Sequence, residues 1–206
     1  MIALSGPRLV AASAVLVTAM SAFILLAEGT GEAGVREVVR ATARTSAVFF
    51  CAAFGAAALQ RLFPGPVTMW MRRNRRYLGL SLAASHTVHL LAVGALVAPD
   101  PAGFVAERGG FASQVPALFA VAMLVALAVT SNDVSVRRLG ERRWRMLHLS
   151  AGYVVFVAFL VSFSGRVLTE GVYAVFTALL LATLGLRAAA AVSVRRARRV
   201  VAAETP

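Results

Sequence analysis

Lysine is missing from the sequence: all 21 basic residues are arginine, against nine aspartate and glutamate residues, so the formal net charge is +12. A strongly basic chain can indicate nucleic-acid binding. Here, however, the arginines cluster at the ends of long apolar segments, which is typical of contacts with anionic lipid headgroups. We therefore expect no nucleic-acid partner.

Cysteine is scarce, and its scarcity excludes several classes of site. The single cysteine, Cys51, lies inside an apolar segment, so an internal disulfide is excluded and we expect a small buried side chain. Glycine-rich phosphate loops, dinucleotide fingerprints and paired CxxC motifs are also missing. We therefore expect no flavin or nicotinamide domain within these 206 residues.

Apolar sequence is abundant, because hydrophobic residues make up 59% of the chain. A water-soluble fold of this size cannot bury so much apolar surface. Six apolar segments of about 17 to 22 residues have the length that a helix needs to cross about 30 Å of hydrocarbon. They cover roughly residues 9–27, 45–62, 77–98, 115–131, 146–163 and 171–192. We predict one all-α domain over residues 1–206, a polytopic membrane bundle of six transmembrane helices whose first helix is retained.

The distribution of arginine predicts the orientation of this bundle. With six spans, both termini and the loops after the second and fourth spans share one side, and that side holds 16 of the 21 arginines. The opposite side holds the other five arginines and six of the nine acidic residues. The positive-inside rule therefore places both termini in the cytoplasm.

The three histidines all lie in predicted spans, His86 and His89 in the third and His148 near the start of the fifth. An ionisable side chain in the membrane needs a partner in the bundle interior. His86 and His89 share one helical face, and the parallel third and fifth spans could bring them opposite His148. Three interpretations are open: hydrogen bonding between helices, a transition-metal or proton site, and axial ligation of haem b.

Three stretches together resemble the MsrQ/YedZ family of haem-b membrane subunits, which belongs to the ferric-reductase-like transmembrane superfamily. Residues 75–80 (RRYLGL), followed by His89, resemble the family's third span. Residues 42–50 (TARTSAVFF) resemble the start of its second span. Residues 126–148 (ALAVTSNDVSVRRLGERRWRMLH) resemble its fourth span, its basic loop and the opening of its fifth span.

This resemblance implies a protein of the bacterial inner membrane that binds haem b within the bundle. It implies electron transfer from a cytoplasmic flavoprotein or a quinol towards a periplasmic reductase partner, which would make the chain an oxidoreductase subunit. His89 matches the family's third-span iron ligand and His148 its first fifth-span histidine, while His86 has no counterpart. A non-redox membrane scaffold that has lost haem is the alternative, as is a transition-metal site made by the three histidines.

The sequence departs from the family at one important position. The family has a further histidine thirteen residues beyond the first one in the fifth span, but here that residue is Val161, which cannot ligate iron. We therefore expect one haem at most. Helix rise places His89 about 15 Å beyond Gly79 and His148 about one turn beyond Arg145. His86 lies about 4.5 Å nearer the cytoplasmic side, so this arithmetic favours His86 as the partner of His148.

Arginines supply the remaining candidate contacts. Arg44 opens the second span from the non-cytoplasmic side and is a candidate partner for a haem propionate. An ordinary interfacial arginine is the alternative for this residue. The arginines of the cytoplasmic loops form a basic rim that could dock an acidic electron donor, although topology and lipid anchoring also explain them.

Overall fold

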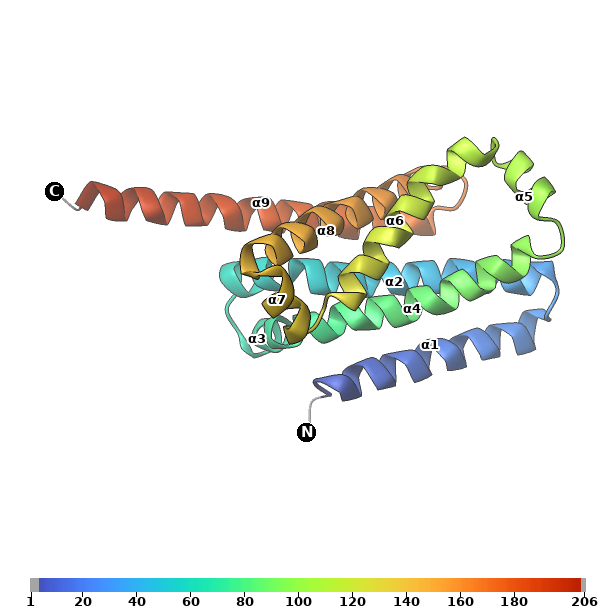
Figure 1. Cartoon of the computed structure of the whole chain (residues 1–206), viewed down its shortest axis with the longest axis horizontal. Helices are drawn as coiled ribbons and strands as arrows, with labels where there is room; N and C mark the ends of the chain where they lie inside the picture. The colour runs from blue at the N-terminus through green and yellow to red at the C-terminus, as the bar shows by residue number, and fades with distance from the viewer. Residues whose placement is uncertain (1–3, 205–206) are drawn as a thin grey trace.

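The computed structural model describes residues 4–204, with side chains up to residue 197, and each regular element in this range is an α-helix (Figure 1). The helices are α1 (Pro7–Glu28), α2 (Glu32–Leu62), α3 (Pro66–Arg73), α4 (Arg75–Val97), α5 (Pro101–Glu107), α6 (Phe111–Val129), α7 (Asp133–Leu139), α8 (Glu141–Ser164) and α9 (Val172–Glu204). Six helices of the described range are long and apolar enough to cross a membrane: α1, α2, α4, α6, α8 and residues Val172–Ala197 of α9. The predicted all-α bundle with six spans is confirmed.

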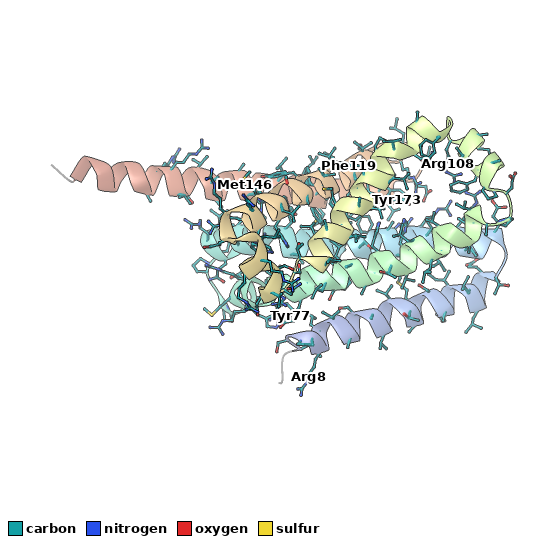
Figure 2. The ribbon with its side chains drawn as sticks, viewed as in Figure 1. Arg8, Tyr77, Arg108, Phe119, Met146 and Tyr173 are labelled. Carbon is teal, nitrogen blue, oxygen red and sulfur yellow. The ribbon has the colours of Figure 1, made fainter. Side chains whose placement is uncertain are left out.

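The two ends of the chain lie toward the same end of the bundle, as six crossings require (Figure 1). The short helices α3 and α7 lie at this end too, and α5 lies at the opposite end. Apolar side chains project from the outer surfaces of the long helices (Figure 2). The cytoplasmic location of the two termini stays a prediction from the arginine distribution.

The helices differ from the predicted spans mainly at their ends. α2 begins at Glu32 rather than near residue 45, because a polar first part is stabilised by ion pairs along the helix, between Glu32 and Arg36 and between Glu37 and Arg40. The short helices α3, α5 and α7 were not predicted. Helices α5 and α7 each have a side-chain cap, since Asp100 accepts a hydrogen bond from the Gly103 amide and Asn132 accepts one from the Ser135 amide.

A seam of small polar residues joins α2 to α4, two helices that pack closely together. Thr42, Ser46, Ser81 and Ser85 are fully buried there. The Ser46 hydroxyl donates to Ser85 Oγ at 3.0 Å, and the Ser85 hydroxyl donates to the Thr42 carbonyl oxygen at 3.3 Å. Small residues let membrane helices approach closely, and their hydroxyls bond across the contact. The seam therefore fixes the register of the two helices, with Ser46 opposite Ser85.

An aromatic cluster joins α2 to α8 and α9. Phe54 of α2, only 6% exposed, stacks on Phe50 with ring centroids 5.0 Å apart and lies 6.1 Å from the ring of Phe156 in α8. Gly152 makes room for it, because a Cβ at that position would lie 3.1 Å from Cε2 of Phe54. Tyr173 of α9, labelled in Figure 2, is fully buried at the far end of this cluster. Thr42, Ser46, Phe50 and Phe54 follow one another at intervals of four residues. The polar seam therefore continues into the aromatic cluster along neighbouring parts of one face of α2.

Candidate functional site

His89 is tied to α2 through one ring nitrogen. Its Nδ1 lies 3.1 Å from the Val39 carbonyl oxygen and 3.2 Å from Thr42 Oγ1. The carbonyl can only accept, and the Thr42 hydroxyl already donates to the Val38 carbonyl oxygen at 2.6 Å, so Nδ1 of His89 carries the proton. Nε2 of the neutral ring then carries a free lone pair, and no described residue donates a hydrogen bond to it. Metal-ligating histidines are commonly held in this way, through the other ring nitrogen.

His86 lies nearly one turn before His89 and faces α8. Its ring stacks on that of His89, with centroids 4.8 Å apart, and meets the ring of Phe159 edge-on at 6.2 Å. The Nδ1 atom of His86 is buried and has no hydrogen-bond partner among the described residues. Buried polar atoms are nearly always bonded. His86 is therefore a second imidazole of α4, and one of its ring nitrogens lacks a hydrogen-bond partner among the described residues.

His148 has a different environment, at the contact between α6 and α8. Its Nε2 lies 2.9 Å from Thr130 Oγ1, and the Thr130 hydroxyl donates to the Ala126 carbonyl oxygen at 2.5 Å, so Nε2 donates to Thr130. Trp144 packs against the His148 ring at 4.1 Å between centroids and donates from Nε1 to the Thr130 carbonyl oxygen at 2.8 Å. In this arrangement His148 bonds one helix to another, and its Nε2 is occupied.

The expected facing of His86 and His148 is not found. His86 meets Phe159, which lies eleven residues beyond His148 on α8 and therefore about 16 Å further along the helix. The sequence arithmetic was wrong because it aligned the two spans by their arginines, whereas packing against Thr130 and Trp144 holds His148 in the early part of α8. Val161 is 64% exposed and points out of the bundle.

Arg44 lies in α2 at the opposite end from the chain termini, within a network of charges. Its guanidinium is 3.4 Å from a carboxylate oxygen of Glu170 and 3.6 Å from one of Glu37, and lies 5.0 Å from the ring centroid of Tyr173. Two carboxylates therefore accompany this cation, and the network joins α2 to the loop between α8 and α9. The role of Arg44 as a propionate partner stays a prediction.

The structure brings His86 and His89 together and leaves His148 and Arg44 apart from them. Within the described residues, no group of three or more histidine, cysteine, aspartate or glutamate side chains is arranged to hold a metal ion. The three-histidine metal site is therefore not formed. Sequence reasoning missed Thr42 and Thr130, although each threonine lies close to a span end and threonine hydroxyls form hydrogen bonds between membrane helices.

Comparison with curated proteins finds similarity to the heme-binding subunit MsrQ of protein-methionine-sulfoxide reductase from Ralstonia nicotianae. The two sequences are 34% identical over 113 residues, which is 54% of this chain and 50% of that protein. The match thus spans about half the length of the curated relative. No family model and no solved structure matches the chain. The similarity supports an MsrQ-like family for this chain, as the three sequence stretches indicate.

Proposed function

From this MsrQ-like, six-span architecture we propose that the chain is a haem-b-binding electron-transfer subunit of ferric-reductase-like type, in which His89 is the iron ligand. The observation that carries the proposal is the state of the His89 ring, with Nδ1 protonated and bonded to α2 and Nε2 free. The name of the curated relative, a heme-binding subunit, supports the choice of cofactor.

Two imidazole nitrogens support haem on the α4 side of the bundle. There, His89 presents Nε2, and the unpartnered Nδ1 of His86 marks a second nitrogen available to a ligand. On the α8 side the residue facing His86 is Phe159, which has no donor atom, and His148 donates its Nε2 proton to Thr130. We therefore propose a single haem, whose iron an imidazole of α4 would hold.

Bound haem b supplies one-electron chemistry through its iron. The chain's own residues would orient the His89 ring and keep water away from the imidazoles. Thr42 and the Val39 carbonyl orient the His89 ring, and the seam of Ser46 and Ser85 holds α4 against α2. Phe159 and its aromatic neighbours keep the space beside α8 apolar, which disfavours water near the imidazoles.

The direction of electron flow rests on the predicted orientation. We propose that electrons enter from a cytoplasmic flavoprotein or from a quinol and leave towards a reductase partner on the periplasmic face of the bacterial inner membrane. The basic rim around α3 and α7, which contains Arg72, Arg73, Arg137 and Arg138, is the surface with charge complementary to an acidic cytoplasmic donor.

The direct test is a reduced-minus-oxidised absorption spectrum of the full-length protein, purified from cells with ample haem. We expect the bands of a b-type haem at a stoichiometry close to one per chain. A colourless preparation from the same cells would refute the proposal. It would favour the second candidate, a membrane scaffold, for which the bond of His148 to Thr130 is the supporting observation.

A Thr42→Val variant tests the orientation of the His89 ring. Loss of the hydroxyl leaves Nδ1 with the Val39 carbonyl as its only acceptor, so we expect haem affinity to fall about tenfold, as is usual for such supporting bonds. The imidazole also becomes less basic, so the midpoint potential should rise, which redox titration measures. Thr42→Ser should restore both values.

The matched control is Thr45→Val on the same helix, because the Thr45 hydroxyl donates to the Ala41 carbonyl oxygen and contacts no histidine. An equal rise of the potential in Thr45→Val and Thr42→Val would mean that the effect comes from α2 in general and not from the bond to His89.

A further inference from the structure

Arg187 of α9 is a cation inside a predicted membrane span that no carboxylate accompanies. No acidic group of the described residues lies within ion-pair distance of it. Its Nη1 donates to the Phe54 carbonyl oxygen at 2.8 Å, while its Nε is buried without a partner. Arg44, at the other end of the bundle, has two carboxylates. Arginine in a membrane is costly unless its charge and its N–H groups find partners.

Aromatic rings hold the Arg187 guanidinium in place at the junction of α2, α8 and α9. Its central carbon lies 3.7 Å from the ring centroid of Phe54 and 5.4 Å from that of Tyr153. These contacts fix the plane of the group and stabilise its charge, but they satisfy none of its remaining N–H groups. Arg75, at the start of α4, is near enough to repel Arg187 and adds to the excess of positive charge.

The register of α2 and α4 gives the depth of Arg187. The helices are antiparallel, with Ser46 opposite Ser85, so Phe54, eight residues after Ser46, lies near the level of Tyr77, eight residues before Ser85. Tyr77 follows Arg75 and Arg76 at the very start of α4. Because Arg187 touches Phe54, it lies in the arginine-rich half of the bundle, inside the span. Long arginine side chains in this half of a span extend towards the interface, where the lipid phosphate groups lie.

An exposed apolar stripe leads away from Arg187 along α8. Tyr153, Val157 and Val161 are spaced four residues apart, so they share one face of the helix, and their exposed fractions are 39%, 53% and 64%. The stripe begins beside the guanidinium, at the middle of α8, and runs towards the end of the helix at Ser164. A cation next to an exposed apolar track suits the headgroup and acyl chain of an anionic lipid.

We propose that Arg187 binds the phosphate of an anionic phospholipid, with an acyl chain along Tyr153, Val157 and Val161. Basic pockets between membrane helices bind such headgroups, and a guanidinium binds phosphate through two parallel hydrogen bonds. The phosphate oxygens accept hydrogen bonds from the N–H groups of Arg187 that have no partner among the described residues. The negative charge of the phosphate also balances the positive charges of Arg187 and Arg75. This binding site is independent of whether haem is bound.

Native mass spectrometry of the full-length protein tests this site, with phosphatidylglycerol and phosphatidylcholine added to detergent-solubilised samples. We expect wild-type protein to retain one phosphatidylglycerol in preference to phosphatidylcholine. Arg187→Gln should lower the affinity for phosphatidylglycerol about tenfold or more, the size expected for a lost charged hydrogen bond. The affinity of Arg187→Lys for phosphatidylglycerol should lie between those of wild type and Arg187→Gln, because lysine keeps the charge but not the planar pair of donors.

The matched control is Arg195→Gln, which removes the same charge from an exposed position eight residues further along α9 and should leave lipid retention unchanged. Equal retention of phosphatidylglycerol by wild type and Arg187→Gln would overturn the proposal, as would equal losses in the Arg187 and Arg195 variants. If Arg187→Gln does not fold, Arg187→Lys provides the comparison, and wild-type affinity in that variant would also overturn it.

Discussion

Purified His89→Ala protein is expected to retain less than about a tenth of the haem bound by the wild type, because the ring that the fold orients for iron is gone. His86→Ala should keep most of it. The two histidines differ by three positions on one helix, share a stacked contact and are both partly buried. The difference that matters for iron is that only His89 is held by α2 through Nδ1.

The measurement is haem content per chain, from the absorption of the extracted haem, in parallel purifications of wild type and the two variants. Circular dichroism confirms that each variant keeps its helices. Loss of haem in His86→Ala with retention in His89→Ala would assign the iron to His86 and contradict the role of His89. His148→Ala provides a third comparison, in which we expect haem to be retained, because Nε2 of His148 is bonded to Thr130.

The second large effect concerns stability. Phe54→Ala should lower the free energy of unfolding by about 3 kcal/mol, the lower end of the range for removing a buried phenylalanine. The lower end applies because lipid is as apolar as the core, so that lost packing rather than transfer to water makes up the cost. Phe54 packs on α8 at Gly152, stacks on Phe50 and supports Arg187 of α9, so the cavity would lie where three helices meet.

Unfolding by sodium dodecyl sulfate in mixed micelles, followed by circular dichroism, measures this change. Phe23→Ala is the matched control, since Phe23 of α1 is 71% exposed and should alter the free energy of unfolding by no more than about 0.5 kcal/mol. Similar losses in Phe54→Ala and Phe23→Ala would show that the aromatic cluster does not hold α8 and α9 to α2.

The spans could be predicted from the sequence because hydrocarbon thickness sets their length and lipid forces the backbone to bond within each segment. The arginine distribution predicts an even number of crossings, which agrees with chain ends that lie toward the same end of the bundle. The ends of helices depend on polar residues outside the membrane, such as Glu32 and Asp100, where apolar periodicity carries no information. The start of α2 and the short helix α5 were missed for this reason.

The candidate site was predicted only in part. His86 and His89 could be placed on one helix face by their spacing, and the structure stacks them. The sequence could not predict which residues of α8 lie opposite His86 and His89. The relative position of two helices along their axes depends on how each packs against a third element. Here Thr130, at the C-terminal cap of α6, fixes the position of His148, and the aromatic cluster fixes that of Phe159. No periodicity within a single segment contains these contacts.

The hydroxyl chain of Ser46, Ser85 and Thr42 determines which parts of the molecule can move. Sliding or rotating α4 against α2 would break buried hydrogen bonds that lipid cannot replace. The α2–α4 pair is therefore one unit, and it carries both His86 and His89. A ligand that binds these two imidazoles would meet a pair of helices whose offset is set before the ligand arrives.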